Sequence, residues 1–168
     1  MSANASPFAQ RHGWKLYRAG AFAEAFDRLE TEVTRLAAVD PDQYRSHPKA
    51  KLLKRIVDLV FEEIPRDPAS PLYSLGNTLG PAQRHWRRAK FMQRFRLFFR
   101  FDTSSRVIIY AWVNDENTLR KAGSRSDPYE VFLRRLQAGD PPGAWQELLK
   151  EAEAEALAGK IRQNPSRF

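Results

Sequence analysis

The stretch RFRLFFRF at residues 94–101 constrains the fold more than any other part of this sequence, because its apolar and cationic side chains alternate. A period of two is typical of a β-strand. Every second residue from Phe95 to Phe101 lies on one side, which predicts a hydrophobic core. The other side requires a further explanation, because it carries Arg94, Arg96, Phe98 and Arg100.

Two neighbouring strands are expected beside this one. The side chains of residues 86–92 (WRRAKFM) alternate in type between the two faces of a strand. Residues 107–114 are apolar on both faces, as in a central strand. Directly paired residues share a face, so the loop 92–94 would pair Phe91 with Phe95. This register sets Lys90 opposite Arg96.

The same reasoning across the loop 103–105 pairs Asp102 with Arg106 and sets Arg96 opposite Trp112. Neither loop contains glycine, which three-residue hairpins favour. The arginine side of the sheet is then expected to carry four aromatic side chains, those of Trp86, Phe98, Tyr110 and Trp112.

The rest of the chain predicts helices around this sheet. Residues 14–18 form a short first strand, and the apolar spacing over 21–36 predicts an amphipathic helix. Asp40 and Pro41 are typical of a helix start, and the helix that follows is most regular over 49–64. Residues 65–82 predict a loop packed on the domain. Asp127 and Pro128 open another helix, and a last one covers about 143–158.

This pattern predicts an α+β fold with one domain over residues 13–158. Residues 1–12 are expected to form a flexible arm, and residues 159–168 a frayed tail.

Composition narrows the function classes. The chain has 28 Lys and Arg against 20 Asp and Glu, a net charge of +8, and a pI near 10.0, which suits a polyanionic partner. It has no cysteine and three histidines without ligand spacing, so we expect no metal site and no cofactor. No segment has about 18 consecutive apolar residues, so we expect a cytoplasmic protein without a membrane span.

The opposition of Lys90 and Arg96 admits two interpretations. Like charges in direct cross-strand pairs destabilise a sheet, so the fold alone gives no reason for them. One interpretation is an edge of solvated arginines that discourages sheet aggregation. The other is an anion site, in which guanidinium groups grip phosphate and aromatic rings stack on bases.

These residue types suit one reaction in particular. The sequence shows no nucleophile–histidine pair and no phosphate-binding glycine loop. Cleavage of RNA by its own 2′-hydroxyl needs only a base, cations for the phosphorane and an acid. Lys90, crowded by arginines, has its charged form disfavoured and is a candidate base.

Several segments resemble the YhaV toxins of PrlF–YhaV type II toxin–antitoxin systems, within the RelE/ParE-like group. They are GWKLY, KLLKRIVDLVFEEI, DPASP, WRRAKF, RFRLFFRF and IIYAWVNDENTLR, in this order, over about residues 13–150. The resemblance implies a RelE-like fold, with N-terminal helices on a small, mostly antiparallel sheet and C-terminal helices across it. It implies an mRNA-cleaving ribonuclease at or near the ribosome. It also implies a PrlF-like antitoxin that neutralises the toxin and, with it, represses the shared operon at the operator DNA.

The resemblance also implies site residues. The catalytic candidates are Arg88, Lys90, Arg96 and Tyr129. Arg94, beside Arg96, is an RNA-binding candidate on the same ground. Further RNA-binding candidates, which do not depend on the resemblance, are Arg87, Arg100, Trp112, Asn114, Asn117 and Arg120.

The general base is left open, because no histidine lies near the helix that carries Tyr129. Lys90, Tyr129, Asp115 and Glu116 are alternatives. Structural roles compete with each assignment: the two loop acids can pair with Arg120 or Arg94, the asparagines can form turns, and Tyr129 and Trp112 can pack.

Two functional alternatives accompany the ribonuclease hypothesis. ParE-like relatives are non-catalytic toxins that act on DNA gyrase, so the fold alone does not decide. The cationic row can also serve as the docking surface for an acidic segment of the antitoxin.

Overall fold

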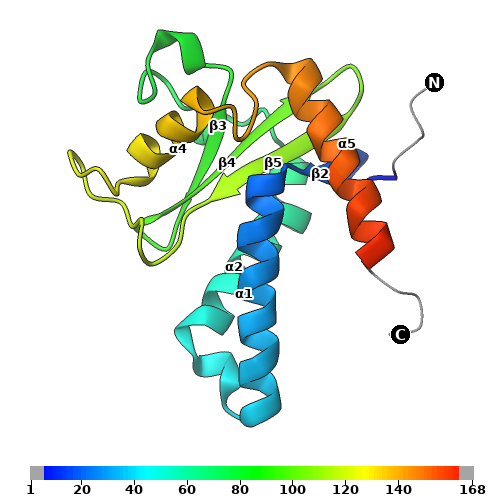
Figure 1. Ribbon diagram of the computed structural model, residues 1–168, viewed down its shortest axis with the longest axis vertical. Helices are drawn as coiled ribbons and strands as arrows, with labels where there is room; N and C mark the ends of the chain where they lie inside the picture. The colour runs from blue at the N-terminus through cyan, green and yellow to red at the C-terminus, as the bar shows by residue number, and fades with distance from the viewer. Residues whose placement is uncertain (1–5, 163–168) are drawn as a thin grey trace.

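The structure is a computed structural model and describes residues 6–162 (Figure 1). Its centre is one mixed sheet of five strands in the order β1-β2-β5-β4-β3. Their bounds are β1 (Ala9–Arg11), β2 (Trp14–Arg18), β3 (Arg87–Phe91), β4 (Phe95–Asp102) and β5 (Val107–Val113). Only the β2–β5 pair is parallel within this sheet. The α+β class predicted from the sequence is confirmed.

Helices cover both faces of the sheet. One face packs against α1 (Gly20–Val39), α2 (Pro48–Asp58) and the π-helical turn η2 (Leu59–Glu63), which continues into α3 (Ile64–Arg66). The other face packs against α4 (Pro128–Gln137) and α5 (Trp145–Arg162). Figure 1 shows α1 and α2 extending well beyond the sheet. The remaining helical turns are the 3₁₀ elements η1 (Tyr44–Ser46), η3 (Pro71–Tyr73) and η4 (Pro81–Gln83).

Each face of the sheet therefore buries its own core. The α1–α2 side includes Leu97, Phe99 and Tyr110, and the α4–α5 side includes Phe98 and Trp112. The core on the α1–α2 side contains every second residue from Phe95 to Phe101, as predicted. The second side was expected to carry an open row of arginines and rings, and that expectation is wrong: α4 and α5 cover its rings.

The predicted register of β3 and β4 is confirmed. Phe91 pairs with Phe95, Lys90 with Arg96, and Arg88 with Phe98. Lys90 and Arg96 are thus like charges in direct opposition, at the end of the sheet next to the 92–94 turn.

The predicted register of β4 and β5 is wrong. Asp102 pairs with Val107 instead of Arg106, and a bulge opposite Phe98 and Phe99 then shifts the pairing by one residue. The bulge reverses the faces of the first half of β5. Tyr110 consequently lies in the α1–α2 core, where its hydroxyl donates to Val60 O at 2.6 Å, and not beside the arginines.

The expected helix start at Asp40 is also wrong. Asp40 is the C-cap of α1, and the next helix begins at Pro48, where the His47 side chain caps the backbone N–H of Lys49. The loop 65–82 packs on the domain as predicted, because Tyr73, Leu75 and Leu79 are buried.

The terminal segments are more regular than predicted where they are described. Residues 9–11, expected within a flexible arm, form β1 and pair with β2. Helix α5 continues to Arg162, past the predicted start of a frayed tail at residue 159. The tail residues 163–168 and the arm residues 1–5 lie outside the described residues. Among residues 6–162, no helix combines the length and the apolar character that a bilayer crossing requires.

Candidate functional site

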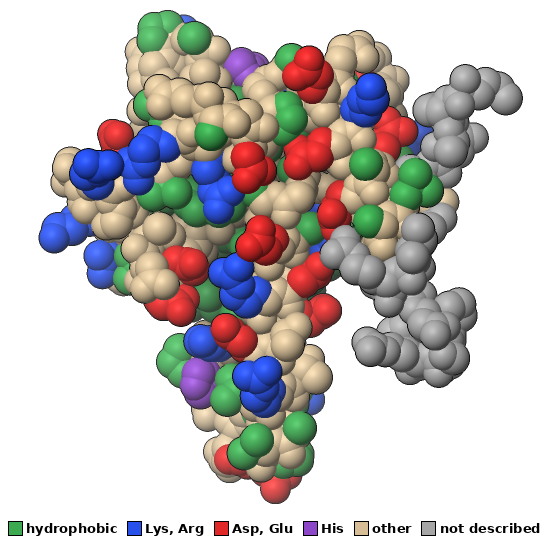
Figure 2. All heavy atoms as spheres, viewed as in Figure 1, with side chains coloured by type: hydrophobic (Ala, Val, Ile, Leu, Met, Phe, Trp, Pro, Cys, Tyr) green, Lys and Arg blue, Asp and Glu red, His purple; other side chains and the backbone are tan. Residues whose placement is uncertain are grey.

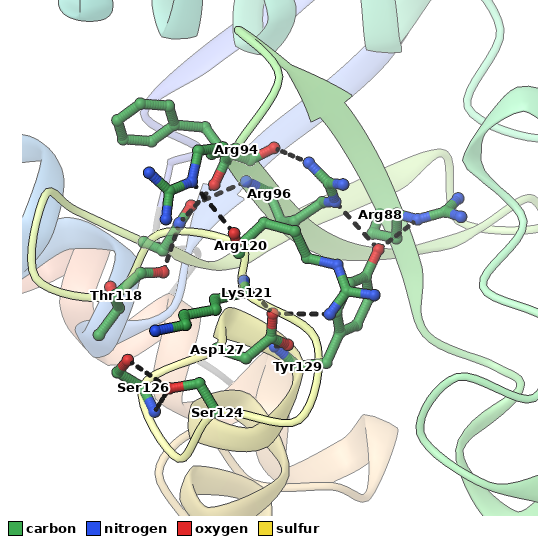
Figure 3. Close-up of polar contacts among 12 residues, drawn as sticks. Arg88, Arg94, Arg96, Thr118, Arg120, Lys121, Ser124, Ser126, Asp127 and Tyr129 are labelled. Carbon is green, nitrogen blue, oxygen red and sulfur yellow. Dashed lines mark hydrogen bonds and ion pairs between the residues drawn. The ribbon is translucent and has the colours of Figure 1, made fainter.

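The phenol oxygen of Tyr129 joins two strand arginines. It accepts a hydrogen bond from Arg88 Nε at 2.8 Å and from Arg96 Nε at 3.1 Å (Figure 3). Arg88 lies on β3, Arg96 on β4 and Tyr129 in the first turn of α4. Three elements that are distant in sequence therefore converge on one oxygen atom.

Helix α4 brings Tyr129 to this position by a local signal in the sequence. Asp127 is the N-cap, Pro128 follows at the first helical position, and Asp127 Oδ2 accepts from the backbone N–H of Tyr129 at 3.1 Å. Asp127 Oδ1 also accepts from Arg120 Nη1 at 2.6 Å and from the backbone N–H of Lys121 at 2.7 Å. We call Arg88, Arg96, Arg120, Asp127 and Tyr129 the Tyr129 cluster.

Backbone carbonyls hold the two strand arginines in place. Arg96 Nη1 donates to Gln93 O at 3.0 Å and to Phe95 O at 2.8 Å, and Arg88 Nη1 donates to Ser74 O at 2.7 Å. Gln93 lies in the turn between β3 and β4 and has φ 65°, next to Met92 with φ 45°. Left-handed backbone at a non-glycine residue costs about 1–2 kcal/mol. This strained turn directs the Gln93 carbonyl at a buried guanidinium.

Further cations surround the cluster. Arg94 Nε donates to Arg120 O at 3.1 Å, and the guanidinium carbon of Arg120 lies 4.9 Å from the ring centre of Tyr129. Lys90 and Lys121 are exposed beside them. Six cations thus gather around one buried carboxylate, that of Asp127. A cluster of this sign, with N–H donors on forked guanidinium groups, suits a phosphate.

The structure places two predicted RNA-binding arginines elsewhere. Arg87 lies on the α1–α2 side of the sheet, with its guanidinium 5.4 Å from the ring centre of Phe101. Arg100 lies between the rings of Trp86 and Trp145, and its Nη1 donates to Gly143 O at 2.7 Å. Burial lowers the pKa of Arg100. Both arginines have packing roles.

The ring of Trp112 is not open to a base. Its side chain is 5% exposed and stacks with Phe98 and Phe132, with centroid distances of 6.0 and 6.1 Å. Arg135 covers it at 5.4 Å. The prediction that Trp112 stacks on RNA does not fit this burial.

Asn114 has a structural role next to the cluster. It is 3% exposed, and its Oδ1 accepts from the backbone N–H of Arg96 at 2.7 Å. Its Nδ2 donates to Arg94 O at 3.1 Å and to Thr118 O at 2.8 Å. The side chain thus extends the pairing of β4 beyond the end of β5 and leaves no group for RNA.

The loop acids lie next to helices α1 and α2. Asp115 Oδ1 accepts from Asn117 N at 2.9 Å and from Thr118 Oγ1 at 3.0 Å, so it stabilises its own turn. Asp115, Glu116 and Asn117 line a hollow of about 220 Å³ with residues of α1 and α2. The expected ion pairs of these acids with Arg120 or Arg94 do not form. Asn117 is exposed, so its side chain stays a candidate RNA contact.

Sequence reasoning missed one member of the cluster. Asp127 was expected only to cap a helix, yet its carboxylate also pairs with Arg120. The available signal was a capping acid seven residues after an arginine, which is too common a pattern to predict a contact. Among the described residues, no group of three His, Cys, Asp or Glu side chains is placed to hold a metal ion.

The fold and the cluster define a small α+β protein with cations gathered at the start of α4, and Figure 2 shows Lys and Arg side chains around that helix. Residues 16–153 match the profile of the YhaV toxin family, which is described as a toxin with endonuclease activity, of a toxin–antitoxin system. The "Ribonuclease toxin YhaV" of Escherichia coli (strain K12) is 42% identical over 149 residues, which cover 87% of this chain and 97% of that protein. "Toxin YhaV" of Escherichia coli O157:H7 gives the same identity and coverage. No solved structure matches.

The chain therefore belongs to the YhaV toxin family, as its sequence motifs predicted. It is an endonuclease toxin of a toxin–antitoxin system, so an antitoxin is its partner. The RelE-like character of the fold stays a prediction.

Proposed function

We propose that this chain is an endoribonuclease that cleaves mRNA through attack of a ribose 2′-hydroxyl on the adjacent phosphate. The observation that carries the proposal is the phenol oxygen of Tyr129 between two guanidinium groups. The relative from strain K12 is itself named a ribonuclease toxin, which supports RNA as the substrate. The products are a 2′,3′-cyclic phosphate, or the 3′-phosphate formed from it, and a free 5′-hydroxyl.

Arg88 and Arg96 bind the scissile phosphate. A guanidinium has five N–H donors, and the protein bonds of each arginine involve only Nε and Nη1 within the described residues. The Nη2 donors are therefore available to the non-bridging phosphate oxygens. Fixed donors of this kind stabilise the extra charge of the phosphorane.

Tyr129 and Lys90 move the two protons. The Tyr129 oxygen already accepts two N–H bonds, so its own O–H is left to donate, and it protonates the departing 5′-oxygen. Lys90 Nζ accepts the proton of the 2′-hydroxyl as the bond from 2′-oxygen to phosphorus forms and the bond to the 5′-oxygen breaks. Its exposed side chain lies directly opposite Arg96 in the sheet. No step of this scheme requires a metal ion.

The RNA strand contacts the exposed cations beside the cluster. These are Arg94 and Lys121, with Asn117 at the far end of the loop, whereas Arg120 is half-buried against the Tyr129 ring and paired with Asp127. Arg87, Arg100, Trp112 and Asn114 are not part of the proposed interface, because packing or backbone hydrogen bonds occupy their side chains. Asp115 and Glu116 are not proposed as the base, because they line the hollow with α1 and α2.

The cellular setting is also a proposal. The chain acts in the cytoplasm on mRNA at the ribosome, and a PrlF-like antitoxin binds it in a hetero-oligomer. That complex binds operator DNA through the antitoxin and represses the shared operon. Membership in the family supports the antitoxin partner, and the net charge of +8 suits an acidic antitoxin segment.

The test uses purified protein and end-labelled RNA, with and without ribosomes, in EDTA. We expect cleavage to persist in EDTA and to leave cyclic or 3′-phosphate ends. Arg88→Gln and Arg96→Gln should lower the cleavage rate at least 100-fold while circular dichroism shows a folded protein. Arg45→Gln is the matched control, because it removes an exposed cation at the remote α1–α2 connection and should keep the full rate. Full activity of both site variants would contradict the assignment, and intact RNA with damaged DNA would favour a gyrase-directed toxin.

A further inference from the structure

Asp127 is a buried carboxylate inside a site for an anion. Its side chain is 2% exposed, and it lies beside the arginines that would hold a phosphate. A negative charge at this place weakens the attraction for phosphate. Helix capping does not require the charge, since Ser, Thr and Asn cap helices about as well as Asp. The carboxylate therefore needs another reason to be there.

The contacts of Asp127 supply that reason. One carboxylate oxygen accepts from Arg120 and from the backbone N–H of Lys121, and the other accepts from the backbone N–H of Tyr129. Figure 3 shows the carboxylate between the Arg120 guanidinium and the start of α4. It thus ties the loop that precedes α4 to the residue that carries the phenol.

Arg120, once held there, restricts the Tyr129 ring. Its guanidinium carbon lies 4.9 Å from the centre of that ring, and the Phe98 ring meets it edge-on at 5.6 Å. A ring enclosed in this way keeps its hydroxyl directed at Arg88 and Arg96. Without the ion pair, Arg120 would be free to leave the ring.

We propose that Asp127 is a positioning residue, which acts through Arg120 to hold the Tyr129 hydroxyl between Arg88 and Arg96. The inference rests on the proposed function, in which that hydroxyl delivers a proton. Proton delivery occurs only in the transition state, so loss of positioning lowers kcat and leaves KM nearly unchanged. A purely structural role for Asp127 would lower the fraction of folded protein and leave the rate of the folded fraction intact.

The first test compares two variants that break the same ion pair from opposite ends. Asp127→Asn can still cap α4 but removes the charge that pairs with Arg120. Arg120→Met leaves Asp127 and its capping bond intact. We expect each to lower kcat about tenfold or more, with KM within threefold of wild type and little change in Tm. An unchanged kcat in Arg120→Met would overturn the proposal, and this variant also decides the matter if Asp127→Asn does not fold.

The second test is a double-mutant cycle with Tyr129→Phe on ordinary RNA. If Arg120 and Asp127 act through the phenol, then Tyr129→Phe combined with Arg120→Met or Asp127→Asn should cleave within threefold of the Tyr129→Phe rate. If the double variant instead loses rate by the product of the two single losses, the positioning role is overturned and the role of Tyr129 stays intact. Full activity of Tyr129→Phe alone would instead refute the proposed function.

Discussion

Removing the charge of Lys90 should stabilise this protein while disabling it. Lys90 is exposed and directly opposite Arg96, so the two cations repel each other across the β3–β4 pair. For two unit charges about 7 Å apart in a medium with a dielectric constant of about 40–80, Coulomb repulsion amounts to about 0.6–1.2 kcal/mol. Mutational data on like-charged cross-strand pairs give the same order, up to about 1 kcal/mol.

The perturbation is Lys90→Gln, which keeps a polar side chain of similar length. At about 2–4 °C per kcal/mol for a chain of this size, Tm should rise by about 1–5 °C at low salt. In 1 M NaCl the Debye length falls to about 3 Å, so the difference in Tm between the variant and wild type should largely vanish. The cleavage rate should fall at least 100-fold, because the variant lacks the proposed base.

The matched control is Lys54→Gln on α2. Lys54 is also exposed, but it forms an i,i+4 ion pair with Asp58 at 2.6 Å. Its loss should therefore lower stability by about 0.3–0.5 kcal/mol and leave cleavage unchanged. Differential scanning calorimetry and single-turnover cleavage measure both quantities on the same samples. The reasoning would be refuted if Lys90→Gln were less stable than wild type at low salt, or if it cleaved RNA at the full rate.

Three further outcomes test other parts of the account. Phe98 is fully buried on the α4–α5 side, so Phe98→Ala should cost about 3–5 kcal/mol in a urea titration, whereas a solvated stacking residue would cost little. Tyr110→Phe removes the hydroxyl that donates to Val60 O, so stability should fall by about 1–3 kcal/mol while the cleavage rate of the folded protein stays unchanged. Burial raises the pKa of Glu151 above its ordinary 4.5, so the folded state keeps that proton to a higher pH than the unfolded chain. Stability should thus fall as pH rises from 4.5 through the folded-state pKa, and Glu151→Gln, which can still accept from the backbone N–H of Gly20, should remove that fall.

The β3–β4 hairpin could be predicted from the sequence because its residues alternate. Phe91 and Phe95 had to share the core face, and that parity alone brought Lys90 opposite Arg96. No comparable constraint existed for β5, since VIIYAWV is apolar on both faces and any register buries it equally well. The bulge that moves Tyr110 to the other core left no signal in the pattern.

A different reason explains why the sequence did not predict that α4 and α5 cover the second face of the sheet. The row of arginines on β4 indicated a solvated surface, but Arg100 contributes to packing between two tryptophans, and Arg96 is 7% exposed. Whether a guanidinium is buried depends on the carbonyl acceptors that surround it, such as Gln93 O and Phe95 O, and these are set by turn geometry. Family resemblance named Tyr129, and only the packing of α4 on the sheet brings its hydroxyl to both arginines.

The most direct test of the central claim uses an RNA whose scissile 5′-oxygen is replaced by sulfur, a leaving group that needs no acid. On ordinary RNA, Tyr129→Phe should cleave about 10²- to 10⁴-fold more slowly than wild type. On the sulfur-substituted RNA it should cleave within a few-fold of wild type, while Arg88→Gln stays slow. An equal defect of Tyr129→Phe on both substrates would show that the phenol between Arg88 and Arg96 is not the group that protonates the leaving oxygen.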